Sequence, residues 1–183
     1  MNIFKFLIVF LLVHNFFLPA QSSQKNALNE LFNQLKKVNN SKTAQLLEKK
    51  ILSIWNEHPN DIKLTEKLEF GIELMQYGDY DYALKIFNNI LVTDPEWSEA
   101  WNKRATVFFL MKRYKKSLYD IERVLKIESR HFGALSGQAR IFIKLQEYEK
   151  AIISLKRTLK FYPLFRSREL IPEIERLIKE ESI

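Results

Sequence analysis

Residues 98–137 read SEAWNKRATVFFLMKRYKKSLYDIERVLKIESRHFGALSG, and this stretch decides the fold. Large apolar residues recur along it at helical spacing, with Trp101 and Phe108 on a first segment and Ile121 on a second. Such spacing predicts two amphipathic helices. The turn between them falls just before Tyr114. The stretch therefore predicts one helical hairpin followed by the start of another.

The flanking segments copy this pattern with a fixed period of 34 residues. Four columns of residues keep that step: Tyr80, Tyr114 and Tyr148; Gly71, Ala105 and Ala139; Ala83, Ser117 and Ala151; Pro95, Ser129 and Pro163. A period in this range indicates stacked helical hairpins. Small residues fall where two helices must approach closely. We therefore predict an all-α fold, an α-solenoid of stacked antiparallel helical hairpins.

The same columns resemble the pattern of the tetratricopeptide repeat (TPR) family. The middle hairpin carries the resemblance through Trp101, Arg104, Ala105, Phe108, Ser117, Ile121, Val124 and Ser129. Ser129 stands where the family has proline, and Lys67 in the preceding hairpin stands where it has tryptophan. The motifs AWNKRAT and ESRHFGALSG are similar to those of a group of small exported alphaproteobacterial TPR proteins.

The pattern divides the chain into four parts. We predict a signal peptide at 1–22, a degenerate N-terminal helical hairpin at 23–61, three repeats within 62–163 (about 64–97, 98–131 and 132–163) and a C-terminal capping helix within 164–183. Terminal repeats are expected to be atypical because one of their faces meets solvent. We therefore expect the N-terminal hairpin to be a degenerate repeat that caps the stack.

The first 22 residues have the three-part plan of a secretory signal. One lysine precedes the apolar run FLIVFLLV, and small residues follow it. We predict cleavage after Ser22, or else after Ala20, and export to the periplasm. His14 and Asn15 interrupt the apolar run, which leaves it short of the ~20 residues of a membrane-spanning helix. An uncleaved anchor in the inner membrane, facing the periplasm, is the alternative.

Composition limits the chemistry of the chain. It has 183 residues, no cysteine and a formal charge of +7, so disulfides, thiol nucleophiles and cysteine metal sites are excluded. The basic residues are spread through the helices. Those that could bind nucleic acid or an anionic surface are Lys112, Arg113, Lys115, Lys116, Lys156, Arg157 and Lys160. Because export argues against a nucleic-acid partner, this interpretation ranks last.

The TPR resemblance implies that the first helix of each hairpin lines a concave face. The residues predicted to bind a partner there are Asn102, Thr106, Phe109, Ser136 and Arg140. An apolar strip with a few polar groups suits a peptide segment. We therefore predict a non-catalytic adaptor for a protein or peptide partner. The alternative is a membrane-anchored structural or assembly scaffold, with membrane contact only if the signal segment stays uncleaved.

Some TPR domains grip a chaperone's carboxyl terminus with Lys and Asn on the first repeat and Lys and Arg on the third. The matching positions here hold Leu68, Ile72, Gly133 and Gly137, so this clamp is absent. Gly133 and Gly137 serve either close packing of helices or binding of a partner. On the second interpretation, Arg130 and His131 join Ser136 at the rim of a small anion or peptide-terminus site.

The sequence does not favour an enzyme. His58 and His131 are the only histidines after residue 22, and we expect them in different hairpins at opposite ends of the stack. No HxxxH pair, glycine-rich phosphate loop or activated-serine motif occurs. We therefore expect no catalytic residues, no metal site and no cofactor.

Overall fold

The computed structural model describes residues 22–181, and the part of the predicted signal segment before Ser22 lies outside them. Every regular element in this range is helical, so the predicted all-α solenoid is confirmed. The N-terminal helix is described over residues 22–37. It is followed by α2 (Ser41–Asn56), α3 (Ile62–Gln76), α4 (Tyr80–Thr93), α5 (Ser98–Leu110), α6 (Tyr114–Ile127), α7 (Phe132–Lys144), α8 (Tyr148–Leu159), the 3-10 helix η1 (Arg166–Glu169) and α9 (Leu170–Glu181).

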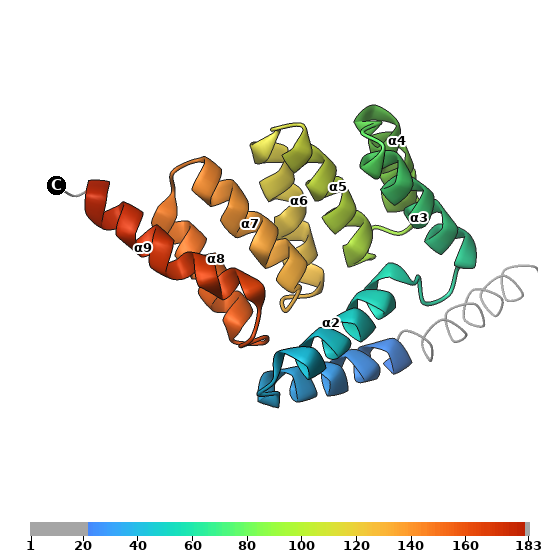
Figure 1. Ribbon diagram of the computed structural model, residues 1–183. Coiled ribbons are helices and arrows are strands. Elements are labelled where there is room, and N and C mark those ends of the chain that lie inside the picture. Colours follow the sequence, from blue (N-terminus) through green and yellow to red (C-terminus); the bar gives the residue numbers. More distant parts are fainter. Residues whose placement is uncertain (1–21, 182–183) are drawn as a thin grey trace, which may run out of the picture.

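Three hairpins, α3–α4, α5–α6 and α7–α8, stack side by side in chain order (Figure 1). The second helix of each hairpin begins at Tyr80, Tyr114 or Tyr148, so the 34-residue tyrosine column marks the turns. The residue two places before each tyrosine adopts a positive φ, +85° at Gly78 and +59° at Lys112 and Gln146. Glycine takes that conformation without strain, whereas a residue with a Cβ does not.

Close approach of the two helices in a hairpin explains the columns of small residues. A Cβ added at Gly71 would lie 2.6 Å from Cε1 of the buried Phe87 on α4. In the next hairpin, the buried Ser117 donates a hydrogen bond from Oγ to the backbone oxygen of Ala105, over 2.7 Å. Each column position therefore marks a point where α-helical backbones cross with little space between them.

The N-terminal hairpin does not stack beside the first repeat as one further unit of the array. In Figure 1 it runs beneath the repeats toward the last of them. Its apolar face, which includes Phe32 and Trp55, forms one buried cluster with Phe132 of α7 and with Tyr162 and Phe165, which follow α8. Those three aromatic residues offer a large apolar surface, and burying it outweighs a nearest-neighbour arrangement.

Two polar contacts fix the hairpin in this place. The Tyr162 hydroxyl donates to Glu48 Oε2 over 3.0 Å, and Arg130 Nη1 donates to Asn29 Oδ1 over 2.8 Å. These contacts join residues 114 and 101 positions apart in the sequence. The ends of the repeat array are therefore tied together by the hairpin.

The C-terminal helix covers the last repeat. Ile174 of α9 is buried in one apolar cluster with Ala139 of α7 and Leu155 of α8. Pro172 lies in the first turn of α9, where its missing N–H costs no helical hydrogen bond. Between residues 22 and 181, no helix combines the length and the apolar character that crossing a bilayer requires.

Candidate functional site

A cavity of about 290 Å³ opens on the side of α5 and α7 that the TPR resemblance makes concave. The structure brings all five predicted partner-binding residues to this cavity: Asn102, Thr106 and Phe109 from α5, and Ser136 and Arg140 from α7. Gly133 and Gly137 also line it. We call it the concave cavity.

Four further residues of the lining could not be assigned from local sequence patterns. They are Glu48 and Leu52 of α2, Phe165, and Arg166 at the start of η1. They reach the cavity because the N-terminal hairpin docks against the segment that follows α8. The cavity is therefore enclosed by parts of the chain that no single repeat contains.

The floor of the cavity is apolar. Phe109 and Ala105 of α5, Ile121 of α6 and Phe132 of α7 contribute to it. Ile121 and Phe132 are only 2% exposed, so their positions are set by packing in the core. An apolar side chain of a partner that became fully buried against this floor would gain roughly 1.5–3 kcal/mol.

The two cavity glycines differ in what surrounds them. A Cβ at Gly133 would lie 3.3 Å from Cε1 of His131, which is tighter than most real contacts, so packing accounts for this glycine. A Cβ at Gly137 would meet only Ile121 Cδ1 at 3.7 Å, an ordinary van der Waals distance. Glycine inside a helix costs about 1 kcal/mol relative to alanine. At Gly137, helix packing does not explain why the chain has glycine in place of the more stable alanine.

The polar groups of the lining are oriented by hydrogen bonds. Asn102 donates from Nδ2 to Glu99 Oε1 over 3.1 Å, which leaves its amide oxygen as an acceptor. Thr106 donates from Oγ1 to the backbone oxygen of Asn102 over 2.9 Å, so its hydroxyl oxygen can also accept. Both groups suit the N–H donors of a peptide backbone.

Arg140 and Arg166 are exposed at the cavity, and neither guanidinium has a hydrogen bond or ion pair with another residue between 22 and 181. Glu48 is the acidic residue of the lining, and it accepts the hydrogen bond of Tyr162. Burial, and then the charge of Glu48, raise the pKa of the Tyr162 hydroxyl, so it remains a donor. The lining therefore carries one negative and two positive charges.

A buried network lies behind the cavity wall. Glu99 is 1% exposed, and it accepts from Lys103 Nζ over 2.7 Å and from His131 Nε2 over 2.8 Å. His131 Nδ1 accepts from the backbone N–H of Ala134, so Nε2 is the ring nitrogen that donates to Glu99. Burial by itself raises the pKa of Glu99, but Lys103 and then His131 outweigh it and lower the pKa to about 2.

This network corrects the predicted rim site. His131 is fully buried, because its side chain caps the first turn of α7 and reaches Glu99. Arg130 is held by both oxygens of Glu128, by Asn29 and by the ring of Phe32, 4.4 Å from its guanidinium carbon. His131 is therefore not part of an open rim, and Arg130 lies at a different pocket, beside Asn29 and Glu128.

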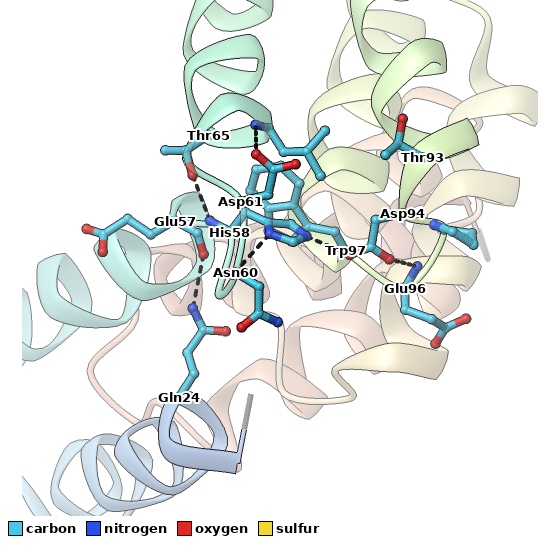
Figure 2. Close-up of polar contacts among 12 residues, drawn as sticks. Gln24, Glu57, His58, Asn60, Asp61, Thr65, Thr93, Asp94, Glu96 and Trp97 are labelled. Carbon is cyan, nitrogen blue, oxygen red and sulfur yellow. Dashed lines mark hydrogen bonds and ion pairs between the residues drawn. The ribbon is translucent and has the colours of Figure 1, made fainter. Parts of the chain in front are cut away.

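The two histidines are not at opposite ends of the stack. His58 Nε2 donates to Asp94 Oδ2 over 2.8 Å beside Trp97, and Figure 2 shows this junction. The Trp97 indole donates to the backbone oxygen of Trp55, whose ring stacks on His131. The hydrogen bond from His58 lowers the pKa of Asp94 despite partial burial. Both histidines thus belong to one structural junction around two tryptophans.

The other predicted chemistry can be placed as well. Lys112, Arg113, Lys115 and Lys116 lie at the turn from α5 to α6, whereas Lys156, Arg157 and Lys160 lie at the far end of α8. The structure does not gather them into one patch. Within residues 22–181, no group of three or more His, Cys, Asp or Glu side chains could hold a metal ion.

Comparison with known sequences places the chain among repeat proteins. A TPR repeat-containing protein of Rhizobium etli is 36% identical over 118 residues, which are 64% of this chain and 57% of that relative. A TPR repeat-containing protein of Methanocaldococcus jannaschii is 30% identical over 82 residues, 45% of this chain and 14% of that protein. The chain thus spans little more than half of the Rhizobium relative. No protein-family model matches it.

Solved structures with the same fold cover about two thirds of the chain. The first TPR domain of Spaghetti (RPAP3), bound to the HSP90 peptide SRMEEVD, superposes with a TM-score of 0.62 at 20% identity, covering 66% of this chain and 96% of that one. The type III secretion chaperone SycD of Yersinia enterocolitica, in complex with a peptide of the translocator YopD, gives 0.60 at 15% identity, covering 69% and 100%. The TPR2B domain of yeast Sti1 gives 0.56 at 19% identity, covering 67% and 98%.

Proposed function

Because this chain is a tetratricopeptide repeat protein, related in sequence to TPR repeat-containing proteins and folded like TPR domains, we propose that it is a non-catalytic adaptor. It binds a peptide or protein segment in the concave cavity, and it works in the bacterial cell envelope.

One observation carries the binding part of the proposal. The five residues predicted for partner binding converge on one cavity that has an apolar floor and two arginines with no hydrogen bond or ion pair to another residue between 22 and 181. Unpaired cations beside buried apolar surface are typical of a recognition site. The matched structures of RPAP3 and SycD each hold a peptide, which supports a partner of that class for this fold.

The cavity would hold a partner by three kinds of contact. An apolar side chain would pack on Phe109 and Ile121, backbone N–H groups would donate to Asn102 and Thr106, and an acidic group would pair with Arg140. None of these contacts makes or breaks a covalent bond. The ionisable groups of the lining, Glu48, Arg140 and Arg166, suit electrostatic pairing.

Site-specific photocrosslinking in native cells tests this proposal. A photoreactive phenylalanine analogue at Phe109 should crosslink a partner protein, and Arg140→Ala in the same chain should remove that product. The analogue at Tyr119, which is 59% exposed on α6 and outside the cavity lining, is the matched control. Equal crosslinking from both positions, or a product that survives Arg140→Ala, would contradict binding in the cavity.

Location in the envelope is supported by the signal-like pattern of residues 1–22, together with the similarity of its motifs to exported proteins. The intact mass of the protein from fractionated native cells tests it. A mass that lacks residues 1–22 or 1–20 in the soluble envelope fraction is the expected result. A full-length mass in the membrane fraction would favour the anchored scaffold, and one in the cytosol would contradict export.

A further inference from the structure

The lining of the concave cavity also indicates which class of partner it accepts. Helix packing does not require glycine at position 137, since an added Cβ would make only an ordinary contact with Ile121. The cavity beside this glycine lies over the apolar floor of Phe109 and Ile121. A partner side chain that enters beside Gly137 would therefore be apolar, and the cavity volume of about 290 Å³ leaves room for a large one.

The charges of the lining set the second feature of the partner. Arg140 and Arg166 contribute two positive charges, and Glu48 contributes one negative charge. The surplus of one positive charge complements a single carboxylate better than a dianion. A guanidinium pairs with a carboxylate through two parallel hydrogen bonds, which also fixes direction.

The size of the cavity limits the distance between the apolar side chain and the carboxylate of a bound partner. Leu52 of α2 and Phe165 close the cavity on the side of the N-terminal hairpin. At about 290 Å³ the cavity has room for one large side chain and a short length of backbone. An apolar group and a carboxylate that both bind inside the cavity are therefore close neighbours in the partner.

We infer that the concave cavity recognises a short acidic-apolar peptide element. One large apolar side chain sits over Gly137, and a carboxylate within two residues of it pairs with Arg140 and Arg166. The backbone N–H groups between them donate to Asn102 Oδ1 and Thr106 Oγ1. This inference rests on the proposed adaptor function and adds the chemistry of the partner to it.

An array of random-sequence heptapeptides tests the inference, with each peptide made both as a free acid and as a carboxyl-terminal amide. The whole protein is applied as wild type, as Gly137→Leu, which fills the opening, and as Arg140→Gln. We expect bound peptides to pair a large apolar residue with a carboxylate, to bind at least tenfold more weakly to Arg140→Gln, and to be lost with Gly137→Leu. Binding of amides identifies a side-chain carboxylate, whereas binding of free acids alone identifies the chain end.

Arg113→Gln is the matched control, because Arg113 is an exposed arginine outside the cavity lining. It should leave binding unchanged. Arg140→Glu provides a gain of function: it should select peptides in which lysine replaces the acidic residue. Urea unfolding of every variant shows that lost binding does not reflect lost folding.

The results separate the two proposals. Peptides that depend on Gly137 but are neutral or basic would overturn the acidic-apolar element and leave the adaptor function standing. Peptide binding that is indifferent to Gly137→Leu and Arg140→Gln in folded protein would overturn both.

Discussion

The imidazole of His131 lies flat against the indole of Trp55, with ring centroids 4.0 Å apart and planes 8° from parallel. Trp55 belongs to the N-terminal hairpin, and His131 caps α7 of the last repeat. Through Nε2 the same imidazole donates to the buried Glu99 of the middle repeat. One side chain thus joins three parts of the chain that are distant in sequence.

Substitution of His131 should therefore destabilise the fold strongly. We expect His131→Ala to lower the free energy of unfolding by about 3 kcal/mol, because the helix cap, the stack and a partner of a buried carboxylate are lost together. Urea unfolding measures this loss. His131→Asn keeps a capping side chain and should recover about 1 kcal/mol. A loss below about 0.5 kcal/mol for His131→Ala would show that the network contributes little.

Glu99 should make the free energy of unfolding depend on pH in the acidic range. Its pKa is lowered to about 2 from 4.5, so its stabilising contribution is complete above pH 4.5 and declines as the pH falls toward 2. The free energy of unfolding should fall by about 3 kcal/mol between pH 4.5 and pH 2 because of this one group. Unfolding measured from pH 6 to pH 2 should show a shallower decline for Glu99→Gln. Asp94 and Glu128, whose pKa values are also lowered, should leave some dependence in that variant. If the free energy of unfolding fell equally with pH in the wild type and in Glu99→Gln, Glu99 would not have this role.

The glycines provide a pair of opposite predictions. Gly71→Ala should lower the free energy of unfolding by about 2 kcal/mol or more, because the new Cβ would lie 2.6 Å from the fully buried Phe87. Gly137→Ala should leave it unchanged or raise it by up to about 1 kcal/mol, because helix propensity improves and the Cβ meets only an ordinary contact. Chemical denaturation of both variants checks the pair. If Gly137→Ala destabilised the protein, helix packing would after all explain why glycine occupies position 137.

The docking of the N-terminal hairpin can be tested at Phe32. Its ring lies 6.4 Å from Phe132 and 6.5 Å from Phe161 between centroids, so Phe32→Ala should leave a cavity and cost about 3 kcal/mol. Hydrogen exchange should rise at the start of α7 and after α8, more than in α3 and α4. Phe70→Ala, at a position that is 46% exposed, is the control and should change exchange little. Increased exchange confined to α3 would instead place the hairpin beside the first repeat.

The sequence predicted the repeats well because their contacts are local. Each hairpin packs on the next, so a 34-residue period in columns such as Tyr80, Tyr114 and Tyr148 is enough to define it. The cavity residues on α5 and α7 were predicted from the TPR resemblance, which implies that the first helix of each hairpin lines the concave face. Glu48 and Arg166 did not, because they reach the cavity through a contact that spans more than 100 residues. Periodicity reports which face of a helix is apolar, but not which distant surface will cover it.

The docking of the N-terminal hairpin on the end of the array, which includes the hydrogen bond from Tyr162 to Glu48, constrains the number of repeats. In an open array each repeat contacts only its neighbours, so units can be duplicated or lost without disturbing the rest. Here one more hairpin would carry Tyr162 and Phe165 a full unit away from Phe32 and Trp55. Both halves of the aromatic cluster would then be left open to water. An added hairpin would therefore lower the stability of the fold, so the docked N-terminal hairpin disfavours growth of the array by internal duplication.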